Sequence, residues 1–164
     1  MALTYREVGA TADAQLPAGY RHLEVTGELG PVDVDEVGEA LLSWRLHRRA
    51  GVRMRADGPA EPGRRVVTVL GLPPLGVAAP CEVVRVTREP GRYAFAYGTL
   101  PGHPFTGEEE FRVELDGRGR ARMSVRAFSR PVGRLGRLLA PLLAVGQRVY
   151  SRHLIATARR MRQA

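Results

Sequence analysis

The sequence has no lysine, only one cysteine and few aromatic residues, and each shortage excludes a class of protein. The single cysteine, Cys81, cannot form an intramolecular disulfide, and a cysteine-rich metal site is excluded with it. Aromatic residues make up 6% of the chain and do not alternate with the basic ones. The chain therefore lacks the stacking surface that single-stranded nucleic acids need.

The formal net charge of +8 comes entirely from arginine, which supplies all 25 basic residues. Such a bias is typical of an arginine-coding, GC-rich genome. Nucleic-acid binding is the alternative interpretation of a basic chain. The arginines, however, are spread over many segments, and glycine-rich motifs that hold phosphates are absent from the sequence. We therefore predict no nucleic-acid partner.

Long apolar runs are also missing, and no stretch approaches the roughly 20 residues that cross a bilayer. The segment from Met1 to Val8 has no basic region leading into an apolar one, so no signal peptide is predicted. We expect a cytoplasmic protein without stable membrane insertion. With 164 residues, 44% hydrophobic and 26% charged, the sequence favours a single globular domain over residues 1–164.

Apolar patterning divides the chain into a strand, a helix, a run of strands and a last helix. Period-two alternation predicts a half-buried strand over 20–28. Helical spacing predicts a helix over 34–49, with Asp33 or Asp35 as its N-cap. The closely spaced strands that follow are typical of an antiparallel meander, and they are expected at 52–56, 65–72, 81–87, 92–99, 108–115 and 120–129, with a loop at 73–80.

A longer helix is expected over 131–162, capped by Ser129 and kinked or split at Pro141. A meander curls because strands twist, so this helix can fill its concave face. We therefore predict an α+β, helix-grip fold, in which a curved antiparallel sheet wraps around the long C-terminal helix and a shorter helix follows the first strand. The apolar stripe facing the sheet would consist of Leu135, Leu138, Leu139, Leu142, Leu143, Val149, Leu154 and Ile155.

The densest cluster of unusual residues is FAYGTLPGHPFTGEEEF, from Phe95 to Phe111. It resembles the signature of an uncharacterised bacterial and plant family of domains of unknown function that is grouped with START-like (SRPBCC) proteins. The resemblance spans nearly the whole chain and implies a START-like, helix-grip fold without implying an established reaction. Supporting matches are LPAGY at 16–20, WRLHRRAG at 44–51, PCEVVRV at 80–86 and AFSRP at 127–131.

Strand parity indicates which side chains of this cluster face inward. Glu109 shares a strand face with Phe111 and the other apolar residues of 108–115, so it is expected to be mostly buried. An inward carboxylate needs a partner, and His103, on the connecting loop, is a candidate. A His–Glu pair is the minimum for acid–base catalysis, and Tyr97 and Thr99 add hydroxyl groups.

Three interpretations of the cluster remain open: Glu109 and Thr99 hold the backbone amides of a glycine-rich loop, or the cluster contacts a ligand, or it catalyses a reaction. Elsewhere, Trp44 is interpreted as core or as pocket lining, and Cys81 as a small buried hydrophobe. Ser129 and Arg130 precede the last helix, whose N-terminus can hold an anionic group of a ligand. Gln147 interrupts the apolar stripe of that helix and is expected to face a cavity.

Our leading hypothesis is a binding protein that accepts a small hydrophobic molecule between the sheet and the C-terminal helix. The ligand-contact residues would be Tyr97, Thr99, His103, Glu109, Ser129, Arg130, Gln147 and Trp44. One alternative is a hydrolase, lyase or cyclase that uses His103 and Glu109 as acid and base. The other is a structural or interaction protein with a closed core. The four histidines lack metal-binding spacing, so no metal is predicted, and no cofactor is predicted either.

Overall fold

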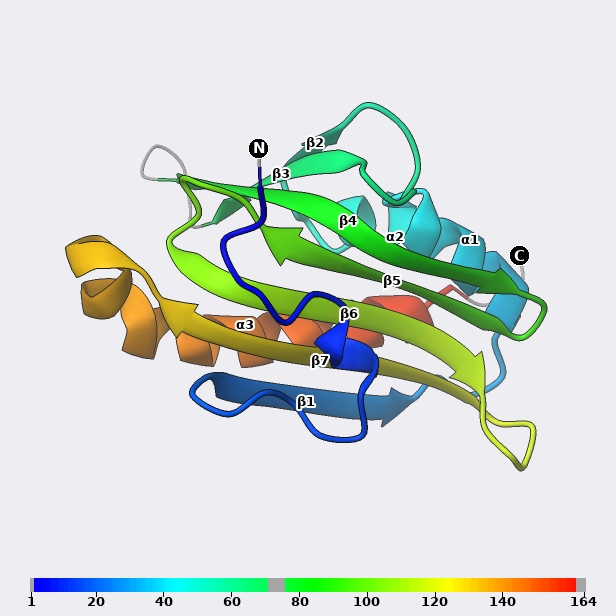
Figure 1. Ribbon diagram of the computed structural model, residues 1–164. Coiled ribbons are helices and arrows are strands. Elements are labelled where there is room, and N and C mark those ends of the chain that lie inside the picture. Colours follow the sequence, from blue (N-terminus) through cyan, green and yellow to red (C-terminus); the bar gives the residue numbers. More distant parts are fainter. Residues whose placement is uncertain (1, 71–75, 162–164) are drawn as a thin grey trace.

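The computed structural model describes residues 2–70 and 76–161, and it contains one curved sheet packed on one long helix (Figure 1). All the strand pairs are antiparallel, in the order β1-β7-β6-β5-β4-β3-β2. The predicted helix-grip fold is therefore confirmed. In chain order the elements are η1 (Ala10–Ala12), β1 (Arg21–Glu28), α1 (Val34–Leu42), α2 (Arg45–Arg49), β2 (Met54–Ala56), β3 (Arg65–Leu70), β4 (Val77–Glu89), β5 (Arg92–Thr99), β6 (Phe105–Leu115), β7 (Ala121–Pro131) and α3 (Gly133–Arg159).

The predicted strands are present, but several are longer than their apolar patterns. β4 begins at Val77 rather than at residue 81, because residues 77–80 pair with β3. β6 begins at Phe105 rather than at residue 108, because its first residues pair with β7. Residues 71–75, which include the end of the strand expected at 65–72 and part of the loop expected at 73–80, lie outside the described residues.

The single helix expected over 34–49 is wrong, because the chain forms two helices that are separated at Ser43 and Trp44. Asp33 caps α1 as predicted, by accepting hydrogen bonds from two backbone N–H groups. Trp44 then adopts a left-handed conformation, with φ of 64°, which no helix can continue through. Its indole N–H donates to the carbonyl oxygen of Gly58 at 2.7 Å, and this contact holds the break in place.

The start of the last helix also differs from the prediction. Ser129 is not an N-cap, since it lies within β7, where it pairs with Arg21 on one side and Gly107 on the other. Pairing on both sides keeps this part of the chain extended, and α3 begins only at Gly133, after the N-cap Val132. Pro141 lies inside α3 without splitting it.

The two halves of α3 differ in burial. Leu154 and Ile155 are buried against the sheet with Phe95 and Phe111, so the C-terminal half of the helix belongs to the core. The N-terminal half was expected to bury its stripe as well, and this expectation is wrong. The exposed fractions of Leu138 and Leu142 are 77% and 71%, and Val149, just beyond the midpoint of α3, is 59% exposed. Leu143 is half-buried, and the side chains of Leu135 and Leu139 lie outside the described residues.

Residues 2–20 cross the outer face of the sheet, the face away from α3 (Figure 1). Tyr5 and Tyr20 pack edge-on against Phe128, with ring centroids 5.6 and 5.0 Å away, and form a second apolar cluster there. The close approach of Tyr5 explains Gly98, because a Cβ at that position would lie 2.1 Å from the Tyr5 hydroxyl oxygen. The outer face of this part of the sheet is therefore covered.

Candidate functional site

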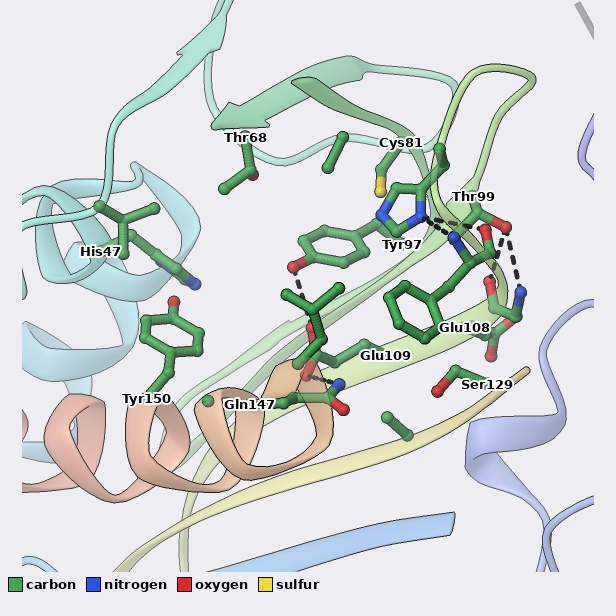
Figure 2. Close-up of a pocket in the computed structure, with 18 of the residues that line it drawn as sticks. His47, Thr68, Cys81, Tyr97, Thr99, Glu108, Glu109, Ser129, Gln147 and Tyr150 are labelled. Atoms are coloured by element: carbon green, nitrogen blue, oxygen red, sulfur yellow. Dashed lines mark hydrogen bonds between the residues drawn. The ribbon is translucent and has the colours of Figure 1, made fainter. Parts of the chain in front are cut away.

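A pocket of about 430 Å³ lies between the inner face of the sheet and α3. Its walls come from elements far apart in the sequence, and Figure 2 shows them converging on one space. The strands contribute Ala79, Cys81 and Tyr97, and α3 contributes Leu143, Gln147 and Tyr150. Most of the surface of the pocket is apolar, but polar and charged side chains, Arg21 and Arg53 among them, also line it.

Glu109 is at the centre of these polar groups. It projects from β6 on the inner face, as strand parity predicts, and it is half-buried. The Tyr97 hydroxyl donates to one carboxylate oxygen at 3.0 Å, and the Gln147 amide donates to the other at 2.9 Å. Arg21 donates in turn to the Gln147 carbonyl oxygen at 2.5 Å. The bond from Gln147 shows that this glutamine faces the pocket, as expected.

The electrostatics of Glu109 are those of a partly compensated carboxylate. Removal from water raises the pKa of Glu109, and the hydrogen bonds from Gln147 and Tyr97 and the charge of Arg21 offset only part of this effect. Burial, together with the nearby carboxylate, also raises the pKa of the Tyr97 hydroxyl well above its usual value. Glu109 and Tyr97 can therefore donate hydrogen bonds to a molecule in the pocket or accept hydrogen bonds from it.

The expected pairing of His103 with Glu109 is wrong. The His103 Nδ1 atom accepts a hydrogen bond from the backbone N–H of Phe105 at 3.0 Å, two residues along the same tight turn. Burial lowers the pKa of His103 to about 4, so the ring is neutral at physiological pH. His103 lines the pocket, but the carboxylate of Glu109 bonds to Tyr97 and Gln147 instead.

Thr99 has the loop-shaping role that was one interpretation of the cluster. Its hydroxyl oxygen accepts a hydrogen bond from the backbone N–H of Gly107 at 3.0 Å and lies 2.6 Å from the Thr4 hydroxyl. Gly107 has φ of 144°, and a Cβ there would lie 2.0 Å from the carbonyl oxygen of Phe128. Thr99 therefore fixes a backbone arrangement that only glycine permits, while Glu109 does not bind these amides.

The remaining predicted contact residues separate into two groups. Ser129 is half-buried in the wall of the pocket. Arg130 is exposed, with its guanidinium group 5.0 Å from the centre of the Tyr20 ring on the outer face. Trp44 is core, with 1% of its surface exposed. Neither Arg130 nor Trp44 is among the described residues that line the pocket.

Sequence reasoning missed His47 and Tyr150, which line one end of the pocket (Figure 2). A signal was present: His47 follows Trp44 by three residues, and Tyr150 follows Gln147 by three, so helical spacing places each beside a residue already singled out. Cys81 is a buried hydrophobe as predicted, and burial raises the pKa of its thiol, so it is not an activated nucleophile.

Two further carboxylates, Glu108 and Glu110, lie on the outer face, and each is 3% exposed. Glu108 accepts four hydrogen bonds: from the Tyr5 hydroxyl at 2.7 Å, the Gly9 N–H at 2.7 Å, and the N–H and hydroxyl of Thr11 at 3.1 and 2.5 Å. Glu110 contacts Arg85 and also Arg112, the latter at 2.7 Å. The bonds to Glu108 attach residues 5–11 to the sheet, and the contact of Glu110 with Arg85 joins β6 to β4.

Within residues 2–70 and 76–161, no three histidine, cysteine, aspartate or glutamate side chains are grouped so that they could hold a metal ion. The same described ranges contain no helix with the length and apolar character needed to cross a membrane.

Two curated relatives are similar in sequence. A UPF0548 protein from Deinococcus radiodurans is 42% identical over 72 residues, which are 44% of this chain and 36% of that protein. A UPF0548 protein from Arabidopsis thaliana is 28% identical over 138 residues, covering 80% of this chain. The matched regions thus span about a third of the first relative and 67% of the second.

Solved structures with a similar fold share little sequence with the chain. A hypothetical protein from Helicobacter pylori matches with a TM-score of 0.61 and 13% identity over 96% of both chains. Ara h 8.0201 matches with a TM-score of 0.56 and 10% identity, over 85% of this chain and 98% of its own. A major latex-like protein from Panax ginseng matches with a TM-score of 0.51 and 15% identity, over 82% of this chain and 98% of its own. These likenesses support the START-like fold alone.

Family membership follows from a match that covers nearly all of the sequence. The family model matches residues 4–157. This region extends from the N-terminal segment on the outer face to the last turns of α3. This chain belongs to the family described as "Domain of unknown function (DUF1990)".

Proposed function

We propose that the protein binds one small, largely apolar molecule in the pocket between the sheet and α3. The observation that carries the proposal is a pocket of about 430 Å³ with apolar walls and a polar cluster of Tyr97, Glu109 and Gln147. Volumes of this size accommodate small organic ligands, and few but well-placed polar groups orient them. A core that evolved only for stability would fill such a space, because voids reduce stability.

Binding is favoured over catalysis by the arrangement around Glu109. Its oxygens are held by Tyr97 and Gln147, and His103 is occupied in its own turn. The acid–base pair considered from the sequence is therefore not assembled. A carboxyl group with a raised pKa can still act as a general acid, so Glu109 with Tyr97 is the pair that a catalytic role would use.

The proposal can be tested with a neutral fluorescent probe, N-phenyl-1-naphthylamine, whose emission rises in apolar surroundings. The parent protein should bind it saturably with one site per chain. Ala79→Phe places a large ring in the pocket wall and should weaken binding at least tenfold. Ala78→Phe, one residue away and exposed on the other face of β4, is the matched control and should leave binding unchanged.

Native mass spectrometry of freshly purified protein gives a second readout, because a ligand that co-purifies appears as added mass. The added mass should be lost in Ala79→Phe and kept in Ala78→Phe. Equal probe binding by the two variants, or no saturable binding by the parent, would contradict the proposed function.

A further inference from the structure

His47 is a buried polar side chain that the protein itself does not satisfy. It projects from α2 and is 1% exposed. Its ring packs against those of Trp44, Phe95 and Phe111, with centroids 5.9, 5.6 and 4.9 Å away. Both ring nitrogens are buried, and neither has a hydrogen-bond partner among the described residues. Such groups are rare in native proteins because each forfeits its hydrogen bonds to water.

The other buried nitrogens without partners belong to Arg112 and Arg122, which do not line the pocket among the described residues. His47 does line it. Figure 2 shows a ring nitrogen of His47 and the hydroxyl of Tyr150 at the same end of the pocket, away from Thr99 and Ser129 at the other end. The unsatisfied group is therefore aimed into the proposed binding site.

Stability does not explain a histidine at this position. Leu46, the residue before it, is fully buried, and a leucine at position 47 would likewise fill the aromatic cluster without leaving an unpaired polar atom. Burial lowers the pKa of His47 to about 3, so the ring is neutral at physiological pH. A neutral imidazole offers one N–H donor and one acceptor nitrogen.

The charges around the pocket restrict what can pair with this ring. The pocket wall includes the cationic Arg21 and Arg53 as well as the Glu109 carboxylate, so an anionic group of a ligand would be drawn to an arginine, whereas the neutral imidazole of His47 pairs best with a neutral hydrogen-bonding group. A hydroxyl group, which can donate and accept at once, suits either tautomer of His47 and can also reach a neighbouring tyrosine hydroxyl. We propose that the His47 end of the pocket recognises the hydroxyl group of a largely apolar alcohol or phenol. This inference rests on the proposed function, since it assigns the ligand class of the same pocket.

The test compares two molecules of similar shape, 2-naphthol and 2-methylnaphthalene, as competitors that displace N-phenyl-1-naphthylamine. The parent should bind 2-naphthol at least tenfold more tightly, because a polar site discriminates strongly against an analogue that leaves it unpaired. In His47→Leu this preference should disappear while 2-methylnaphthalene binds as well as before. His47→Gln keeps a neutral donor and acceptor and should keep part of the preference.

His153→Leu is the matched control, because His153 is exposed on α3 and should change neither affinity. Thermal denaturation of the unliganded proteins provides a readout that needs no ligand: His47→Leu should melt at or above the temperature of the parent. Equal affinity of the parent for the two competitors, or an unchanged preference in His47→Leu, would overturn this inference and leave the proposed function standing. Failure of the fluorescent probe to bind the parent would overturn both.

Discussion

The two faces of the sheet differ in how completely their buried polar groups are hydrogen-bonded. On the outer face, Glu108 receives four hydrogen bonds from residues 5–11. On the inner face, the adjacent Glu109 receives two, and His47 receives none from the described residues. Glu108 and Glu109 are neighbours in the sequence, yet β6 directs them to opposite sides.

The difference separates structural groups from functional ones. A carboxylate whose bonding capacity is filled by its own chain contributes to stability and has little left for a ligand. A polar group that is buried but incompletely satisfied lowers stability, and it is retained where something else completes it. By this criterion the outer face holds the fold together, and the inner face is the side on which we propose that a ligand binds.

The largest expected effect is on the outer face. Glu108→Ala should lower the free energy of unfolding by about 4 kcal/mol, because it removes a charged acceptor and leaves four donors without a partner. Urea denaturation measures the loss. Glu114→Ala, on the same face of β6 but half exposed, is the control and should cost less than about 1 kcal/mol. A small loss in Glu108→Ala would remove the distinction between the two faces.

Lowering the pH should destabilise the protein through His47, the unsatisfied histidine of the inner face. The pKa of His47 is about 3 in the folded protein, below its usual value of 6.5, so the unfolded chain binds more protons between these values. The free energy of unfolding therefore falls as the pH drops through this window, and His47 should account for about 3 kcal/mol of the loss between pH 7 and pH 4.

His103 has its folded pKa lowered to about 4 and adds a loss of the same sign. The contribution of His47 is therefore measured as the difference between the parent and His47→Leu over the same pH range. Identical acid profiles for these two proteins would show that His47 is not held neutral by burial.

Two tyrosines allow a matched comparison of single hydrogen bonds. Tyr5 donates to Glu108 at 2.7 Å, and Tyr97 donates to Glu109 at 3.0 Å. Tyr5→Phe should cost about 2 kcal/mol, because the lost bond is buried and charge-assisted. Tyr97→Phe should cost less than about 1 kcal/mol, because water in the pocket can replace the hydroxyl group. Chemical denaturation of the two variants tests the difference, and the reverse order would contradict it.

The smallest effect on stability is expected at Glu109. Its pKa is raised by burial, so its ionisation lowers stability as the pH rises through that pKa. Glu109→Gln should therefore leave the melting temperature at pH 7 unchanged or slightly higher, with the gain over the parent shrinking toward pH 4. Probe binding should weaken at the same time. A clear loss of stability would instead indicate that Glu109 has a structural role.

Strand periodicity was sufficient to predict the side of the sheet on which Glu109 lies, because alternation along β6 is a local property of the backbone. It could not predict the burial of Glu108 and Glu110, since this depends on residues 2–20, whose irregular sequence carries no periodic signal. The curved sheet around α3 could be predicted for the same reason. The strands and helices were recognised from patterns of period 2 and 3.6, which are local, and their order then indicated the fold.

Two of the errors involve contacts between distant residues, and a third involves the direction of a side chain on a loop. Trp44 ends a helix because of a hydrogen bond to Gly58, which no pattern within 34–49 contains. Ser129 remains in a strand because it has a pairing partner on each side. His103 is only a few residues from Glu109, but a turn directs its ring to the amide of Phe105. Proximity in the sequence does not fix the direction of a side chain on a loop.

The pairing of β1 with β7 has a consequence for the order of folding. Leu23 lies opposite Ala127, and the Tyr5–Glu108 bond joins residues 103 positions apart. During synthesis the N-terminal segment leaves the ribosome first, but its partners are made among the last. The chain must therefore close its longest loops late, which slows folding. We expect refolding to form the β4–β6 hairpins early and to add β1 and the N-terminal segment in a final, slower step.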